Sequence, residues 1–576
     1  MSHTGAALVV KALEDEGIEV AFGIPGTHNI ELYDVLAGSG VRPVLVTDEQ
    51  SAGFMADGYW RASGRMACVN LVPGAGFTHA LSGIAEAWMD NVPMLVLGCG
   101  IRQDVRMAYQ LHDIDQLAMA APVTKATFRP MTGAELYPVI RKACAIARSG
   151  TPGPVMVEVP VNLYLTRHDV EPAGAPESIP APVADNIAQV ADFLAATKSR
   201  PLLYVGLGAA PAGADLVRLA ELLGAPVATT IQGKGVFPES HPLFLWNGFG
   251  NAAPPFARDI AAGCDRVLAI GCRFSEVGTG GYGLTLPGPL CHVDINPEVP
   301  GRNFPAEIKV VCEAGGFVRQ LLGLLSSRLQ PAGDGARDAL MRQIAAGHAE
   351  VARDHTRHRS ADRVSPPLLL ESLQQVFGPE TIYTLDSGNG LFLAMESLRL
   401  DRPGRFLGPV DYSCMGYSVP AAIGARLAQP AVPVVALAGD GAFLMTGLEC
   451  LTAAANGIAV GVIVLRDREL AQIAQFQGTA FNRPVASALP DYDLAGLARG
   501  MGVECLSLSR DADIQAVLEN LRGRMEQGRP VIVDAAVDYS EKTWFTRGVV
   551  KTMLGRLAWK DRLRFVARAI VRKATG

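Results

Sequence analysis

The 576-residue sequence lacks several features that would assign it to a special class of protein. Its 10 cysteines form no Cys-x-x-Cys pair and no cluster with histidine, which argues against a zinc site and against a disulfide framework. No apolar run approaches the about 20 residues that cross a bilayer. The first residues have the pattern of an ordinary helix rather than of a secretory leader. We therefore expect reduced thiols and a cytoplasmic location.

A surplus of basic residues is also missing. The chain has 57 acidic and 51 basic residues, a net charge of −6, which argues against nucleic acid as a partner. Nearly half of the residues (49%) are apolar and 19% are charged, as in globular proteins. The length is sufficient for three domains of ordinary size.

Helical and buried-strand patterns alternate along the chain in three blocks, which cover 1–170, 185–328 and 366–545. Linkers rich in proline or glycine separate the blocks, near 171–182 and 330–335. Repeated alternation of strands and helices predicts a parallel sheet with helices on both faces. We therefore predict an α/β fold of three doubly wound parallel-sheet domains, followed by a basic tail at 546–576.

The stretch 432–470 carries the clearest chemical pattern. It predicts a buried strand over 434–438, a helix over about 447–455 and a second buried strand over 460–465. Such a βαβ unit returns its two strands in the same direction, so both end at the same edge of the sheet.

Two aspartates follow these strands. Asp440 lies between Gly439 and Gly441 after the first strand, and Asp467 follows the second. Open α/β sheets bind ligands at the carboxyl edge, where both aspartates are expected. Two carboxylates beside glycine backbone suit a divalent cation that bridges to a diphosphate.

This arrangement resembles the metal–diphosphate motif of the thiamine diphosphate (ThDP) enzymes. The family usually closes the motif with two asparagines, where this sequence has Arg466-Asp467. Four further segments resemble family motifs in the family's order: FGIPG…LYD at 22–34, DEQ…ADGYWRASG at 48–64, PGAGFT at 73–78 and MGY…PAAIGA at 415–425. The resemblance covers nearly the whole chain and is to the acetolactate synthase and pyruvate decarboxylase group. It implies that the three domains are pyrimidine-binding, central and diphosphate-binding.

The resemblance also implies the cofactor site. Mg²⁺ would be held by the side chains of Asp440 and Asp467 and by the backbone carbonyl of Glu469. The residues expected to contact ThDP are Pro25, Gly26, Glu49, Gly388, Asn389, Met415, Gly439, Asp440, Gly441, Ala442 and Ile473.

Glu49 follows a predicted strand at 44–47 and is the expected catalytic carboxylate. In the family a glutamate bonds the pyrimidine ring and stabilises the imino form that removes the proton from thiazolium C2. Burial suits this task because it raises the pKa of a carboxylate. Met415 resembles the bulky residue that bends the cofactor.

Polar residues near the expected substrate side differ from acetolactate synthase. His28 is placed like a histidine of benzaldehyde lyase that resembles a proton shuttle, and His79 replaces a family asparagine. Gln110 and His112 lie near a glutamine position of acetolactate synthases. We expect His28, Gln110 and His112 to act on the substrate, although surface histidines are the simpler alternative.

The second block resembles segments that surround a structural FAD in acetolactate synthases. These segments are Gly206-Leu207-Gly208, 229–233 and 270–274, and Ser275-Glu276-Val277 follows where the family has Asp-Asp-Arg. Some members keep this domain without flavin, so the resemblance leaves FAD open.

The last thirty residues, 547–576, hold nine basic residues and one acid. Apolar residues at helical spacing make this segment a basic amphipathic helix, a candidate for contact with a membrane surface. A tail that packs on its own acidic body or covers the active site is the alternative.

The resemblance implies an enzyme that removes CO₂ from a 2-oxo acid, with pyruvate as the expected donor, and joins the remaining acyl unit to a second carbonyl compound. It implies a homodimer or homotetramer. Two alternatives stay open: a benzaldehyde lyase-like carboligase or lyase acting on larger 2-hydroxy ketones, and a non-catalytic homologue that binds the cofactor without turnover.

Overall fold

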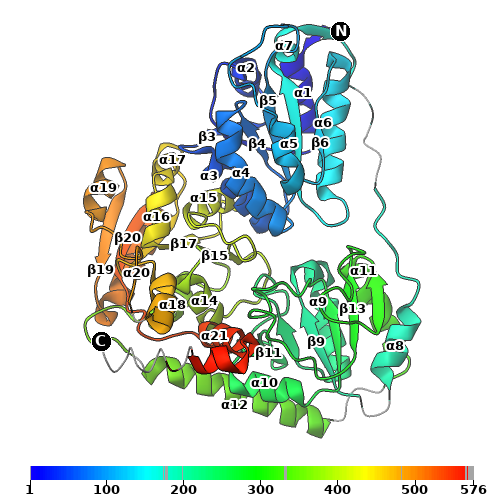
Figure 1. The fold of residues 1–576 in the computed structure, drawn as a ribbon, viewed down its shortest axis with the longest axis vertical. Coiled ribbons are helices and arrows are strands. Elements are labelled where there is room, and N and C mark those ends of the chain that lie inside the picture. The colour runs from blue at the N-terminus through cyan, green and yellow to red at the C-terminus, as the bar shows by residue number, and fades with distance from the viewer. Residues whose placement is uncertain are drawn as a thin grey trace.

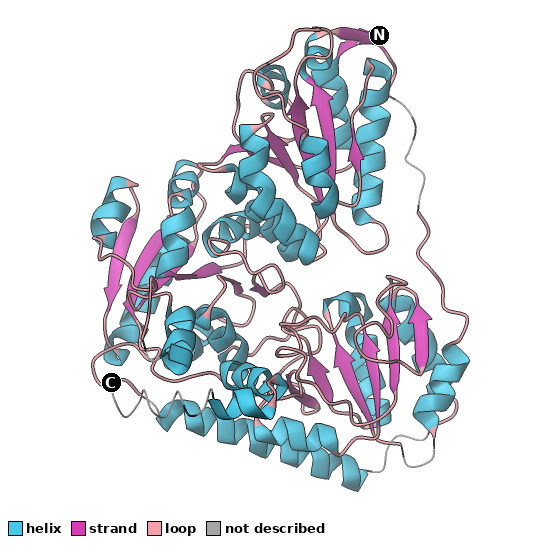
Figure 2. Cartoon of the chain, viewed as in Figure 1, coloured by secondary structure: helices cyan, strands magenta, loops and turns pink. Residues whose placement is uncertain are grey.

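The computed structural model contains three six-stranded sheets, each parallel throughout, and confirms the predicted α/β class (Figures 1 and 2). It describes residues 2–576 except 173, 175–178, 197–198, 330–333, 358, 482, 565–566 and 568–576. Helices cover the sheets on both faces (Figure 2). Among the described helices, none is both long and apolar enough to cross a bilayer.

The N-terminal sheet has the order β3-β2-β4-β5-β7-β6. Its strands are β2 (Val20–Gly23), β3 (Arg42–Leu45), β4 (Cys68–Leu71), β5 (Met94–Gly100), β6 (Thr127–Phe128) and β7 (Pro154–Pro160). Most of these strands are buried on both faces, which explains their nearly continuous apolar sequences. A short antiparallel pair, β1 (Ser2–Thr4) and β8 (Arg167–Asp169), joins the two ends of this domain.

The third sheet has the order β16-β15-β17-β18-β20-β19. Its strands are β15 (Ile382–Leu385), β16 (Phe406–Leu407), β17 (Val434–Gly439), β18 (Gly461–Arg466), β19 (Glu504–Leu508) and β20 (Val531–Ala536). Numbered along the chain, the first and third sheets have the same order, 2-1-3-4-6-5. The two domains therefore share one topology.

The central sheet has a different order, β11-β10-β9-β12-β13-β14. Its strands are β9 (Pro201–Val205), β10 (Val227–Thr229), β11 (Phe244–Asn247), β12 (Arg266–Ile270), β13 (Leu290–Asp294) and β14 (Ile308–Val311). This is the 3-2-1-4-5-6 order of dinucleotide-binding sheets.

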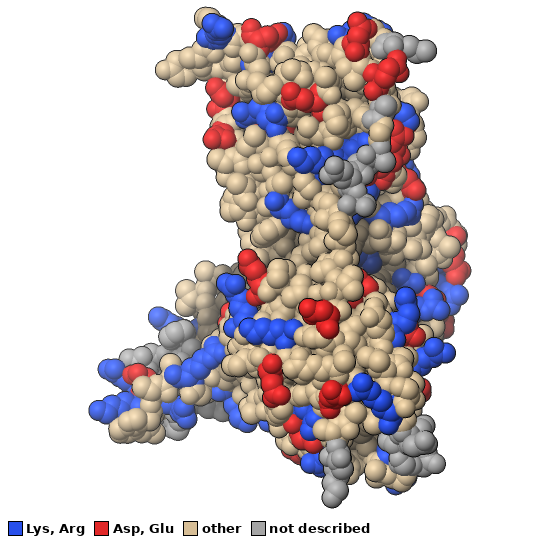
Figure 3. Space-filling model, turned by 90° about the vertical axis from the view of Figure 1, so that its right-hand side faces the viewer, with Lys and Arg blue, Asp and Glu red and all other residues tan. Residues whose placement is uncertain are grey.

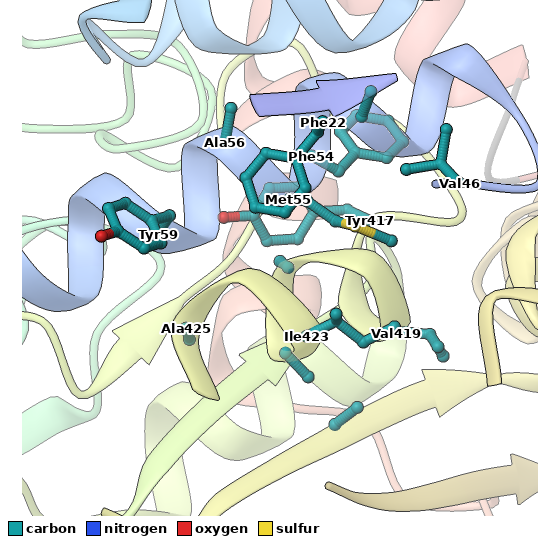
Figure 4. Close-up of a cluster of buried hydrophobic side chains, with 14 of the residues drawn as sticks. Phe22, Val46, Phe54, Met55, Ala56, Tyr59, Tyr417, Val419, Ile423 and Ala425 are labelled. Carbon is teal, nitrogen blue, oxygen red and sulfur yellow. The ribbon is translucent and has the colours of Figure 1, made fainter. Parts of the chain in front are cut away.

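The first and third domains pack together through α3 (Glu49–Ser63) and α15 (Ser418–Ala428), whose side chains form one apolar cluster (Figure 4). Two glycines permit the close approach. A Cβ at Gly58 would stand 2.2 Å from the Ala421 carbonyl oxygen, and one at Gly424 would stand 1.9 Å from the Met55 carbonyl oxygen. Both helices therefore touch backbone to backbone.

A buried polar network crosses the same interface. The guanidinium of Arg61 contacts Asp57 at 2.8 Å and Asp90 at 2.6 Å, and the Tyr417 hydroxyl donates to Asp57. Gln232 of the central domain donates to Asp90. The ADGYWRASG motif thus supplies Asp57 and Arg61, which form the ion pair that buried charges require.

Two expected boundaries differ from the structure. The helix predicted over about 447–455 is preceded by another, since α16 (Asp440–Thr446) begins directly after β17 and α17 (Glu449–Ala455) follows it. Asp440 suits the first turn of α16, because a carboxylate there is attracted to the N–H groups that have no partner within the helix. The expected tail boundary at 545/546 falls inside α21 (Trp544–Arg556), which packs on the body of the protein.

Three contacts hold α21 in place. Its first N–H groups, at Trp544 and Phe545, donate to the carboxylate of Glu396 at 3.2 and 2.9 Å. Gly548 lies against the backbone of residues 251–252 in the central domain. The stripe expected farther along, at Leu563, Val566, Ala567, Ile570 and Val571, lies mostly outside the described residues.

Candidate functional site

The expected site residues gather at equivalent places in the first and third sheets. The strand order reverses between β2 and β4 in one sheet and between β15 and β17 in the other. The crevice beyond the carboxyl ends at such a reversal is where open α/β sheets bind ligands. Pro25 and Gly26 follow β2, whereas Gly388 and Asp440 follow β15 and β17.

At the first edge, Glu49 is the first residue of α3 and is only 8% exposed. Asp48 caps this helix by accepting from the Gln50 N–H at 2.8 Å. The Nδ1 atom of His79, on α4 (Ala75–Met89), lies 3.5 Å from the Glu49 Oε2 atom. A Cβ at Gly76 would stand 2.9 Å from Glu49 Oε1, so α4 closely confines this carboxylate.

The chain before Glu49 is fixed by Glu449 of the third domain. Glu449 Oε1 accepts from the Thr47 N–H at 3.0 Å, from the Thr47 hydroxyl at 2.7 Å and from the Asp48 N–H at 3.2 Å. Glu449 is fully buried, and burial raises its pKa. Sequence patterns did not predict this role for Glu449, whose local signal is one acid in a helix of mainly apolar residues.

Two of the expected histidines meet beside this edge. The rings of His28 and His112 are 5.4 Å apart in an edge-to-face arrangement. His112 has a left-handed backbone (φ 67°) and lies against Gly74, a strained conformation of the kind that clusters at functional sites. Burial, and then the charge of His112, lower the pKa of His28, so its ring is neutral near pH 7. The Gln110 amide instead donates to carbonyls of its own loop, at Arg102 and Val105.

At the second edge, the two aspartates organise the turn after β18. Asp440 is 3% exposed and accepts from the Arg468 N–H at 2.8 Å and from the Gly441 N–H at 2.9 Å. Asp467 accepts from the Glu469 N–H at 3.3 Å. Burial raises the pKa of Asp440, and burial together with the Asp440 charge raises the pKa of Asp467 to about 7. Arg468, which follows Asp467, has a left-handed backbone (φ 66°).

The two cations that flank Asp467 in sequence are engaged elsewhere, and the Arg468 guanidinium contacts Asp491 at 3.2 Å. Arg466 contacts Asp534 at 2.7 Å and Asp491 at 3.1 Å, and it lies over the Tyr492 ring. Neither Asp440 nor Asp467 forms an ion pair within the described part of the chain. Two neighbouring carboxylates without an ion-pair partner fit a divalent cation, which takes hard oxygen ligands. No group of three metal-binding side chains exists among the described residues, so the other ligands would come from backbone, water and the diphosphate.

The backbone around the aspartates is open where a diphosphate would lie. A Cβ at Gly388 or Gly439 would meet no atom within 4 Å, and Gly388 has a φ of 125°. Gly388 precedes α14 (Asn389–Ser397), whose free N–H groups face an incoming anion. Asp386 holds this turn by accepting from the Tyr417 and Ser418 N–H groups, at 2.7 and 3.2 Å. These features fit the expected cofactor.

Met415 lies against the start of α16. A Cβ at Gly441 would stand 3.4 Å from the Met415 methyl carbon. The Thr446 hydroxyl donates to the Gly416 carbonyl at 2.6 Å, which joins the methionine turn to α16. Ala442 is buried within α16. Ile473 lies on α18 (Ala471–Phe481) and is 48% exposed.

The two groups of residues are separate within the chain: no hydrogen bond or ion pair joins Glu49, His28, His79 or His112 to Asp440 or Asp467 in the part that the structure describes. Large apolar side chains are exposed near both groups. In the first domain these are Ile30, Leu45, Tyr109 and Leu111; in the third they are Leu444, Met445, Leu448 and Leu451.

A cavity of about 440 Å³ lies at the carboxyl edge of the central sheet. The three glycine-containing segments singled out in this domain all contribute, through Gly208, Gln232 and Gly271. Asp294, at the end of β13, also lines it, and burial raises the pKa of this carboxylate. The cavity has the place and strand order of a dinucleotide site.

Comparisons with known proteins agree with this geometry. Three family profiles match in order: the N-terminal, central and C-terminal domains of thiamine pyrophosphate enzymes, at residues 3–119, 187–321 and 386–535. A probable acetolactate synthase large subunit of Methanocaldococcus jannaschii is 30% identical, over 93% of this chain and 92% of the relative. The acetolactate synthase isozyme 3 large subunit of Escherichia coli is 30% identical over 94% and 96%. A probable 2-ketoarginine decarboxylase of Pseudomonas aeruginosa is 32% identical over 92% and 93%. The chain therefore belongs to the ThDP-dependent enzymes that form or cleave carbon–carbon bonds, in their acetolactate synthase-like group.

Proposed function

We propose that the protein binds ThDP and Mg²⁺, removes CO₂ from a 2-oxo acid and transfers the remaining acyl unit to a second carbonyl compound, with pyruvate as the donor. The observation that carries this proposal is the pairing of two equivalent sheet edges: one presents Glu49 and the other presents Asp440 with Asp467. The cytoplasmic location expected from the cysteine pattern is part of the proposal.

ThDP supplies, when bound, a carbon nucleophile and an acceptor for the electrons that departing CO₂ leaves behind. The chain's own residues prepare this chemistry. Asp440, Asp467 and the Glu469 carbonyl would hold Mg²⁺, while Gly388, Asn389 and Gly439 offer backbone to the diphosphate. Glu49 would share a proton with the pyrimidine ring, and Met415 would pack against the bound cofactor.

The histidines supply proton transfer on the substrate side. A neutral His28 ring accepts or donates a proton at one nitrogen, and His112 lies beside it. This pair also favours the second candidate, a benzaldehyde lyase-like carboligase that acts on larger 2-hydroxy ketones. Gln110 would join them only after its loop moves, since its amide is bonded within that loop.

We infer that a second copy of the chain completes each site. The separation of the Glu49 and Asp440 groups and the exposed apolar residues near both support this assembly, because such residues mark interfaces. Sedimentation of the purified protein tests it: a homodimer or homotetramer is expected, and a fully active monomer would contradict it.

The decisive experiment measures CO₂ from a panel of 2-oxo acids, with and without ThDP and Mg²⁺, and identifies products by mass. CO₂ release that needs both cofactors supports the proposal. Cleavage of 2-hydroxy ketones without decarboxylation favours the second candidate. No turnover of any substrate, with ThDP bound, would point to the non-catalytic homologue.

FAD is the candidate occupant of the central cavity. The strand order and the three glycine-containing segments support a dinucleotide there. The visible absorption spectrum of the purified protein, before and after denaturation, tests for released flavin. Absence of flavin from protein that is active with ThDP and Mg²⁺ would remove FAD from the proposal.

A further inference from the structure

A second, smaller cavity of about 220 Å³ lies beside the diphosphate turn. We name it the α14–α21 pocket. It opens next to Ser387 and Gly388, and its far side is formed by α21 and by the central-domain loop that contains Val277. Figure 1 shows α14, α18 and α21 side by side at this junction of the third and central domains.

The wall of the α14–α21 pocket is largely apolar. The rings of Phe392 and Phe545 stack with their centroids 3.9 Å apart and their planes 10° from parallel, and both residues are buried. Leu391, Phe476, Val549 and Met553 complete this side. Aromatic rings and branched side chains around a preformed space favour an apolar group of similar size.

The wall of the α14–α21 pocket has few charged side chains. The described lining contains no lysine and no arginine, and its one ionisable side chain is the exposed carboxylate of Glu276. Two neighbouring cations are already bonded: Arg556 donates to the carbonyl of Gly281, which lies at the pocket, and Arg547 contacts Glu541 at 3.1 Å. A carboxylate on a bound molecule would lose water here without gaining a counter-ion, which is costly.

Part of the pocket lies beside residues expected to bind the cofactor. The Ser387 and Ser413 hydroxyls are 2.6 Å apart and form the rim next to Gly388. Gln472 and Phe476, on α18, also line the pocket, and they flank Ile473, an expected cofactor contact. The pocket therefore lies beside the residues expected to hold the cofactor.

We propose that the α14–α21 pocket binds an uncharged apolar substituent of the acceptor carbonyl compound, an aromatic ring or branched aliphatic chain, and discriminates against a carboxylated acceptor. This inference rests on the proposed function. In the reaction, the donor loses CO₂, and its carbonyl carbon forms a bond to the acceptor's carbonyl carbon. The acceptor oxygen takes one proton, so a 2-oxo acid anion, an aldehyde and a proton give a 2-hydroxy ketone and CO₂.

The test compares benzaldehyde with 4-carboxybenzaldehyde as acceptors, using the 2-oxo acid that releases CO₂ fastest. We expect kcat/KM to favour benzaldehyde by about tenfold or more. Val277→Arg, which places a cation on the wall, should narrow or reverse this preference. Val277→Gln, of similar polarity but without charge, is the matched control and should leave benzaldehyde preferred. Val549→Phe, which fills the pocket, should lower benzaldehyde use while acetaldehyde use is retained.

A binding measurement separates recognition from turnover. Saturation-transfer NMR on protein loaded with ThDP and Mg²⁺, without donor, should detect benzyl alcohol and not benzoate. Val549→Phe should abolish the benzyl alcohol signal, and Val277→Arg should create one for benzoate. CO₂ release with equal or better use of the carboxylated acceptor would overturn this inference alone, whereas absence of CO₂ release from every 2-oxo acid would overturn the proposed function.

Discussion

At the scale of single residues, α4 confines the Glu49 carboxylate, and Glu449 fixes the Thr47–Asp48 backbone that precedes Glu49. We predict that Glu49→Gln keeps ThDP bound but loses proton exchange at C2, because an amide cannot favour the imino form. Turnover should fall by about a hundredfold or more. Titration calorimetry measures binding, and NMR measures exchange in deuterated water. Exchange at the unmodified rate would contradict the assigned role.

Asp467 is the residue that most separates this chain from its family's pattern. We predict that Asp467→Asn stays active but needs more Mg²⁺, because an amide oxygen fills the same vertex without the negative charge. Asp467→Ala should lose ThDP retention. Activity and ThDP binding are titrated with Mg²⁺ for both variants. If Asp467→Ala retains cofactor and metal like the unmodified protein, the ligand assignment is wrong.

The sequence predicts some residues of the site better than others. Asp440 and Asp467 follow strands directly, and Glu49 comes four residues after β3, so strand patterns alone place all three at carboxyl edges. The contact of Glu449 with Thr47 joins segments about four hundred residues apart. No local pattern predicts such a pair, because it depends on how the first and third domains pack. His79 was predicted in part. The sequence places it in a family motif, but its approach to Glu49 depends on the geometry of α4.

At the scale of secondary-structure elements, the contact of α3 with α15 depends on glycine. We predict that Gly424→Ala lowers the free energy of unfolding by about 1–3 kcal/mol, because the new methyl group meets the Met55 carbonyl and the helices must separate. Denaturant titration measures this change, with turnover as a second readout.

The control for this substitution is Gly323→Ala, on α11 (Ala314–Ser326). A Cβ there meets no atom within 4 Å, so only helix propensity acts, and a gain of up to about 1 kcal/mol is expected. Equal effects from the two substitutions would contradict the proposed close packing.

Element boundaries show where local patterns fail. The expected helix at about 447–455 was right for α17, but α16 was missed, because two glycines around Asp440 suggest a turn. Tertiary contacts override this local preference: Gly441 is packed by Leu470 and Met415. Similarly, α21 has a basic, weakly patterned sequence, and its position is fixed by Glu396 and by the central domain.

At the scale of the whole molecule, alternating strands and helices predicted three doubly wound domains, which the three parallel sheets confirm. The alternation does not predict strand order, because the same pattern permits several doubly wound orders. The shared order of the first and third sheets explains how Glu49 and Asp440 come to equivalent edges. On the face in Figure 3, acidic and basic side chains are interspersed over the main body, and basic side chains predominate on the projection at the lower left.

The C-terminal segment has two parts with different expected roles. α21 packs on the body and lines the α14–α21 pocket through Phe545, Val549 and Met553. The following residues, 557–576, contain six basic residues and one acid. Each basic residue near an anionic membrane contributes about 1 kcal/mol to attraction.

We predict that deleting 557–576 weakens binding to vesicles containing phosphatidylserine and leaves turnover at saturating substrate unchanged. Deleting 547–576 should in addition lower turnover, because it removes Val549 and Met553 from the pocket wall. Vesicle sedimentation and CO₂ release measure the two effects, and neutral vesicles are the control. Equal vesicle binding by the full chain and both truncated chains would exclude the membrane role. If deleting 557–576 alone abolishes turnover without changing vesicle binding, that segment serves the active site instead.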